Sequence, residues 1–180
     1  MRPFVRLSGE FLPSEARRTL LNRVRSRHFV DVVDHISTSG APDGLSFLPT
    51  ATVERLIPEA LNKLRRTCPL PFTPHVFVFR PGASIAPHVD GRSVRQCAIA
   101  VPLWPHDHEY TPTLFWRDGF VTDQLRYGDL PALMNLQALH SVGASQCHRV
   151  NFQLSFATPY DEARVALEPW HPTFGEDLCE

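Results

Sequence analysis

The pattern of apolar and polar residues divides the chain into a helical first part and a β-rich second part. Apolar residues recur at helical spacing over residues 12–27 and again over residues 52–66. Pro58 lies inside the second stretch, so it must kink that helix or start a new one. A short strand is expected at residues 28–33, and residues 37–46 have the Gly, Ser, Pro and Asp content typical of a loop.

From residue 69 onward the pattern changes to short runs rich in β-branched and aromatic residues. The expected strands are residues 75–79, a short extended piece that carries His88 and Asp90, and residues 96–103, 111–117, 132–137 and 148–157. Residues 96–103 are almost wholly apolar, which predicts burial on both faces. Helices followed by about six or seven strands predict a mainly β fold, with a helical layer packed on a double sheet.

The last expected strand alternates between polar and apolar residues. Arg149, Asn151, Gln153 and Ser155 share one face, and apolar residues occupy the other. A sheet with one face in water gives this pattern, and so does a strand whose polar face lines a cavity. Arg149 follows His140 by nine residues. We expect the strands of these two residues to be neighbours that line the same interior.

Composition and charge limit the class of protein. A length of 180 residues fits one domain with a sizeable core and a pocket. The hydrophobic content of 43% and charged content of 21% are ordinary for a globular protein, and a net charge of −1 indicates neither a nucleic-acid nor a membrane partner. Residues 1–6 lack a secretory signal, and the four cysteines are scattered without metal-binding spacing. A cytoplasmic chain with free thiols is expected.

His88 and Asp90 form half of a possible metal site. Being two residues apart on an extended strand, they leave the same face. A second histidine from a neighbouring strand would complete the two-histidine, one-carboxylate arrangement that suits Fe(II). His-x-Asp alone is a weak signal. A rival pair of histidines at residues 106–109 lies between prolines, which is typical of an exposed loop that is either solvated or in contact with substrate.

Several further pieces follow this pair in order. They are Pro81-Gly82 before it, and Gly128-Asp129, Asn135, His140-Ser141-Val142 and Arg149 after it. With them, residues 75–157 resemble the core of the Fe(II)- and 2-oxoglutarate-dependent oxygenases, especially the prolyl-hydroxylase-like branch. The resemblance implies a distorted double-stranded β-helix, or jelly roll, with flanking helices. It also implies Fe(II) held by His88, Asp90 and His140, and Arg149 paired with the far carboxylate of 2-oxoglutarate.

The activity that the resemblance implies is hydroxylation of an unactivated C–H bond by dioxygen, with succinate and carbon dioxide as co-products. The expected substrate is an amino acid, another small molecule or a peptidyl side chain, and no feature indicates an oligomeric state. Asn151 either donates a second hydrogen bond to 2-oxoglutarate or is a satisfied amide of the cavity wall. In this interpretation residues 1–68 are a helical support region, residues 69–157 are the jelly-roll core, and residues 158–180 are a C-terminal tail.

Two departures from the family pattern leave alternatives open. Arg80 stands where relatives often carry a tyrosine that reaches the cosubstrate, and it either binds an anionic group or lies on the surface. Arg149 and Asn151 also match the Arg-x-Asn of the nucleic-acid demethylating branch, but Ser155 stands where that branch has a second arginine. A nucleic-acid demethylase is therefore a less favoured alternative.

Two other functions fit the same residues. They are a cupin-like metal enzyme that uses no 2-oxoglutarate, and a non-catalytic module that binds metal and keto acid. In each case the loops at 104–112 and 117–127 would set specificity, together with the tail, where Trp170 and Phe174 suggest a lid.

Overall fold

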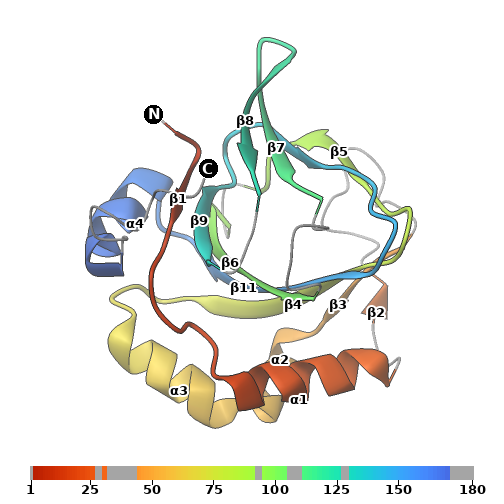
Figure 1. The fold of residues 1–180 in the computed structure, drawn as a ribbon. Coiled ribbons are helices and arrows are strands. Elements are labelled where there is room, and N and C mark those ends of the chain that lie inside the picture. The colour runs from red at the N-terminus through yellow and green to blue at the C-terminus, as the bar shows by residue number, and fades with distance from the viewer. Residues whose placement is uncertain are drawn as a thin grey trace.

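The computed structural model of the chain describes residues 2–26, 30–31, 44–91, 95–104, 111–126 and 130–170. In this part, two antiparallel sheets face each other, and helices α1, α2 and α3 cover the outer face of the larger sheet (Figure 1). The helices are α1 (Ser14–Arg25), α2 (Thr50–Leu56), α3 (Pro58–Thr67) and α4 (Tyr160–Ala166), with a 3-10 turn at Glu168–Trp170. Pro58 starts a new helix, as one of the two predictions for it required.

The larger sheet has the strand order β1-β9-β6-β11-β4-β3-β2. Its strands are β1 (Phe4–Arg6), β2 (Val30–Asp31), β3 (Leu45–Leu48), β4 (Thr73–Phe79), β6 (Cys97–Trp104), β9 (Ala132–Asn135) and β11 (Arg149–Phe156). The smaller sheet has the order β5-β10-β7-β8. Its strands are β5 (Ile85–His88), β7 (Thr113–Arg117), β8 (Phe120–Leu125) and β10 (His140–Val142). Strands β4 to β11 alternate between the two sheets as in a jelly roll, except that β7 and β8 form a hairpin within the smaller sheet, and this confirms the predicted fold class.

Strand β8 departs from the prediction, which places residues 117–127 in a loop. Asp118 and Gly119 both have positive φ, at 52° and 82°, and they form a tight turn between β7 and β8. Such a two-residue turn matches the twist of paired strands and so favours a hairpin. The second half of the expected loop is therefore a strand, at the edge of the smaller sheet (Figure 1).

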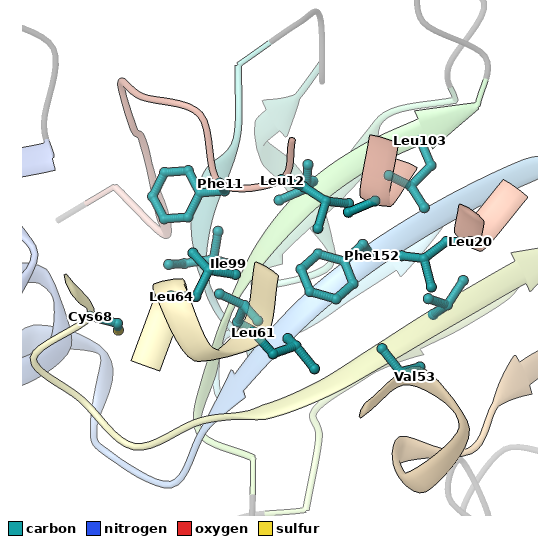
Figure 2. Packing of buried hydrophobic residues seen from close by; sticks show 14 of the residues in the cluster. Phe11, Leu12, Leu20, Val53, Leu61, Leu64, Cys68, Ile99, Leu103 and Phe152 are labelled. Carbon is teal, nitrogen blue, oxygen red and sulfur yellow. The ribbon is translucent and has the colours of Figure 1, made fainter. Parts of the chain in front are cut away.

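The main core lies between the helices and the larger sheet. The apolar residues of β11 and every second residue of β6 face the helices, and Phe152 lies at the centre of this layer. Leu20 of α1 and Leu61 of α3 pack in the same cluster, as Figure 2 shows. Residues 97–103 of β6 are all buried, which confirms the prediction for that strand.

Replacing Phe152 by alanine is expected to destabilise the protein by about 3–5 kcal/mol, because it leaves a cavity in a packed core. Phe120→Ala is the matched control, since Phe120 is 75% exposed while Phe152 is 0% exposed. The control should change stability by less than about 0.5 kcal/mol. Urea unfolding of the two variants checks this, and equal midpoints would contradict the described core.

The polar face of β11 is not in water. Arg149, Asn151, Gln153 and Ser155 are 2%, 0%, 7% and 4% exposed, because the smaller sheet covers them. The alternating pattern of β11 therefore marks a strand whose polar face lines a cavity. The other interpretation, a sheet with one face in water, is wrong. Buried polar groups in such numbers require partners, so this interior is where a site is to be sought.

The C-terminal segment packs on the helical side of the molecule. The ring of Trp170 lies edge-on to Phe11 with centroids 4.8 Å apart, within the core that the helices form. The polar interior lies on the opposite face of the larger sheet, so Trp170 does not form the expected lid over it. Phe174, the other residue of that prediction, is outside the described residues.

None of the helices described here combines the length and apolar character that a membrane crossing requires.

Candidate metal centre

Three side chains that can bind a metal converge where β5 and β10 run side by side. β5 ends at His88, Asp90 follows two residues later, and His140 begins β10 opposite His88. One donor atom from each residue lies within 4.8 Å of the other two. Asp90 Oδ1 is 3.2 Å from His88 Nε2 and 3.7 Å from His140 Nε2. Donors this close together can share one ion.

Hydrogen bonds fix the segment of Asp90 to the turn between β9 and β10. The backbone N–H of Asp90 donates to the carbonyl of Leu136 at 3.0 Å, and Gln137 Nε2 donates to the Asp90 carbonyl at 3.2 Å. His140 lies just beyond this turn. The two parts of the triad, distant in sequence, are therefore held together by backbone contacts as well as by the pairing of β5 with β10.

Both imidazoles have the same tautomer. His88 Nδ1 lies 2.9 Å from the carbonyl oxygen of Ala86, and His140 Nδ1 lies 2.9 Å from that of Ala138. A carbonyl oxygen only accepts, so Nδ1 carries the hydrogen in each ring. The lone pair is then on Nε2, which faces Asp90 in both residues. This is the usual arrangement of metal-binding histidines.

The surroundings of His140 and Asp90 favour the protonation states that a metal needs, whereas those of His88 favour its protonated form. Burial lowers the pKa of His140 to about 4, so this ring is neutral at pH 7. Burial alone would raise the pKa of Asp90, but its contact with His88 and the nearby charge of Arg95 hold that pKa below its usual value. Burial also acts to lower the pKa of His88, yet the bonds to Asp90 and Ala86 leave it raised. A neutral imidazole and an ionised carboxylate are metal donors.

The chemistry of this donor set fits a divalent transition metal. Two imidazole nitrogens and one carboxylate oxygen on one side of an ion leave the opposite side open for other ligands. An open side permits chemistry on a bound molecule, in contrast to the closed cage of a structural site. The site is thus suited to catalysis.

A pocket opens beside the three residues, with about 490 Å³ of space between atoms when the open solvent at its mouth is included. Seven of its fifteen lining residues are apolar and come from both sheets: Leu45, Phe77, Phe79, Ile85, Met134, Leu136 and Val142. Val142, two residues after His140, belongs to this wall. The pocket combines a polar metal-binding corner with apolar sides that limit the access of water.

Arg149 lines the same pocket from the first position of β11. Its Nη1 donates to the carbonyl of Thr111 at 3.1 Å, and its guanidinium carbon lies 5.2 Å from the centroid of the Phe79 ring. A buried guanidinium offers a planar fork of donors that matches a carboxylate. The pocket therefore has a cation on its wall in addition to its metal-binding corner.

All five residues predicted from the sequence as site residues line this one pocket: His88, Asp90, His140, Arg149 and Asn151. The strands of His140 and Arg149 line the same interior, as predicted, but they are not neighbours within one sheet. β10 pairs with β5 and β7, whereas β11 pairs with β4 and β6. β9 ends at Asn135, and a turn carries the chain into the other sheet, so β10 and β11 face each other across the interior and are not paired.

Other predicted features have simpler outcomes. Arg80 is exposed just after the end of β4, in agreement with the surface interpretation. The histidines at 106–109 and the Gly128-Asp129 pair lie outside the described residues.

The sequence did not indicate Arg95 or Thr113, which also line the pocket. Arg95 follows a run of polar residues and Thr113 begins an ordinary strand, so neither had a distinctive local signal.

No family model matches the sequence, and no curated protein is significantly similar to it. Solved structures are similar in fold. A prolyl hydroxylase from Trichoplax adhaerens, in complex with a hypoxia inducible factor peptide fragment, has a TM-score of 0.59 at 14% identity, covering 91% of this chain and 86% of its own. A Pseudomonas putida prolyl-4-hydroxylase has a TM-score of 0.59 at 18% identity, covering 87% of this chain and 93% of its own.

The chain has the fold of the prolyl-hydroxylase-like 2-oxoglutarate oxygenases. HygX from Streptomyces hygroscopicus, a structure with nickel, 2-oxoglutarate and hygromycin B bound, is a third example, with a TM-score of 0.56 at 11% identity over 87% of this chain and 83% of its own. On this oxygenase fold, the His-Asp-His group described above fits the facial triad of non-haem iron enzymes. The resemblance seen in the sequence is thus matched by the fold and by the donor set.

Proposed function

We propose that the chain is an Fe(II)- and 2-oxoglutarate-dependent dioxygenase that hydroxylates an unactivated C–H bond. The observation that carries this proposal is one pocket that contains three converging metal donors and a buried arginine. In the proposal, His88, Asp90 and His140 hold the iron. Arg149 binds the far carboxylate of 2-oxoglutarate, and Asn151, fully buried on the same face of β11, contributes a further hydrogen bond.

Iron bound with 2-oxoglutarate and dioxygen supplies the oxidising chemistry, and it yields succinate, carbon dioxide and a hydroxylated product. The residues of the chain orient and protect these groups. Nδ1–H of each histidine is engaged by a backbone carbonyl, which holds Nε2 toward the ion. Phe77 and Phe79 flank the pocket with apolar surface, and this strengthens charge interactions inside it.

Arg149 suits the far carboxylate for two reasons. Its burial at 2% exposure lowers the local dielectric, so a charge-assisted pair is stronger there than in water. The contacts with Thr111 and the Phe79 ring also hold the guanidinium in one orientation, which reduces the entropy lost when the cosubstrate binds. A lysine at this position would lack the two parallel donors.

The proposed substrate is an amino acid or a peptidyl side chain. Two of the similar structures support the general size of such a ligand, one holding a peptide fragment and one holding hygromycin B. We propose further that residues 1–180 act as one oxygenase domain, in which residues 1–68 support the jelly-roll core and residues 158–180 form a tail. The helical core between α1, α3 and the larger sheet is consistent with that supporting role.

A succinate-release assay tests the proposal. The protein, Fe(II) and 2-oxoglutarate are incubated in air with a panel of amino acids, peptides and small metabolites, and succinate is measured for each. Release that requires iron and rises with one class of panel compound is the expected result. A cupin-like enzyme would consume no 2-oxoglutarate, and a binding module would bind it without forming succinate even when uncoupled, so either outcome would contradict the proposal.

A further inference from the structure

Arg95 joins the Asp90 carboxylate to the polar face of β11. Its Nη1 lies 2.9 Å from Asp90 Oδ2, its Nε donates to Ser155 Oγ at 3.0 Å, and its Nη2 donates to Gln153 Oε1. The guanidinium carbon also lies 5.0 Å from the centroid of the Phe77 ring. Arg95 precedes β6, so its position depends on contacts across the interior and not on its own strand.

The two oxygens of Asp90 are thereby divided between two tasks. Oδ1 faces Nε2 of both histidines, whereas Oδ2 is buried and lies at ion-pair distance from Arg95 without the geometry of a hydrogen bond. An aspartate side chain has two rotatable bonds, and an ion pair on one oxygen limits both of them. The carboxylate is therefore oriented toward the common point of the triad before any ion arrives.

We propose that Arg95 is a positioning residue that holds Asp90 in its metal-binding orientation, with Gln153 and Ser155 as its anchors on β11. This inference rests on the proposed function, because it assigns Arg95 a role toward the iron that the triad would hold. The outer partners of metal ligands typically change metal affinity about 10–100-fold when they are removed.

Two other roles for Arg95 are less consistent with its contacts. An arginine that recognises an anionic substrate would direct its nitrogens into the pocket, but here each of the three nitrogens contacts an oxygen of the protein. A purely electrostatic role predicts the opposite change in metal affinity. A positive charge beside the site repels a cation, so its removal alone would tighten metal binding. Weaker binding after removal therefore distinguishes the positioning role from a purely electrostatic one.

The test is anaerobic titration of Arg95→Met with Co(II) and with Fe(II), following the visible absorption of the cobalt site and the dissociation constant for each metal. We expect about tenfold weaker binding and an altered cobalt spectrum. Arg95→Lys should recover little of the lost metal affinity. Lysine keeps the charge but lacks the several guanidinium nitrogens that contact Asp90 and β11 together. Arg66→Met, which removes an exposed charge from α3, is the matched control and should bind as the wild type does.

A double variant separates positioning from a general effect on the fold. If Arg95 acts through Asp90, then Arg95→Met should add no further loss of Co(II) affinity in an Asp90→Ala background. Ser155→Ala, which removes one anchor and keeps Arg95, should give a smaller loss of about twofold to threefold and remains informative if Arg95→Met does not fold.

The outcomes distinguish this inference from the proposed function. If the wild type binds metal and Arg95→Met binds it equally or more tightly, the positioning role is wrong and the proposed function stands. The positioning role is also wrong if the loss persists undiminished in the Asp90→Ala background. If the wild type itself binds neither Co(II) nor Fe(II), the proposed function fails instead.

Discussion

Replacing Asp90 by alanine is expected to abolish succinate formation and to weaken Fe(II) binding by more than about 100-fold, beyond the range seen when only an outer partner of a ligand is lost. The carboxylate is the sole anionic donor of the triad, and its Oδ1 lies within 3.7 Å of both Nε2 atoms. Without it, two neutral imidazoles remain, and they do not offset the charge of the ion. The variant also leaves the charge of Arg95 beside the site without its partner.

Asp161→Ala is the matched control for this experiment, because Asp161 is exposed in the first turn of α4. It removes the same group without touching the pocket that holds the triad. Succinate formation is measured by mass spectrometry and metal binding by anaerobic competition with a chelating dye. Wild-type turnover in Asp90→Ala would show that the oxidation does not depend on the triad.

Replacing Arg149 by alanine is expected to reduce the affinity for 2-oxoglutarate by roughly 30-fold or more, since truncating one partner of a buried charge pair costs about 2–5 kcal/mol. Metal affinity should remain unchanged, because Arg149 contacts Thr111 and Phe79 and is not one of the three metal donors. This separation of the two affinities distinguishes a cosubstrate-binding arginine from one that only supports the fold. Arg149→Lys should recover only part of the loss.

Arg80→Ala serves as the control for Arg149→Ala. Arg80 immediately follows β4, and Arg149 pairs with Phe79 at the last position of that strand, so the two arginines are near each other in the fold but differ in exposure. Calorimetry on the metal-loaded variants gives both dissociation constants. A loss of 2-oxoglutarate affinity in Arg80→Ala equal to that in Arg149→Ala would contradict the assignment.

Which side chains share one face of a strand could be predicted from local spacing, whereas His140 as the third donor followed only from the family resemblance. The two-residue spacing of His88 and Asp90 implies a shared face on any extended strand, and the alternation around Arg149 implies a polar face. The strands that pack next to these faces depend on pairing between distant parts of the chain, which local spacing does not predict. The sequence therefore indicated residues that line one interior, but not that the strands of His140 and Arg149 belong to opposite sheets.

The remaining differences between prediction and structure have physical reasons of the same kind. β10 is only three residues long, too short for a periodic pattern of its own, so the pattern does not mark the boundary after β9. The hairpin of β7 and β8 does have a local signal, since Asp-Gly between strands favours a tight turn. Arg95 has none: its partners Asp90, Gln153 and Ser155 come together only when the two sheets close on each other.

The central claim is most directly tested by titrating 2-oxoglutarate into the protein by anaerobic calorimetry, with and without Fe(II). A cosubstrate that binds the metal and Arg149 together should bind once per chain when iron is present and at least about tenfold more weakly without it. Iron-dependent binding that is lost in both Asp90→Ala and Arg149→Ala is the result we expect. Binding that is equal with and without iron, or absent in the iron-loaded protein, would contradict the assignment of this pocket as an Fe(II) and 2-oxoglutarate site.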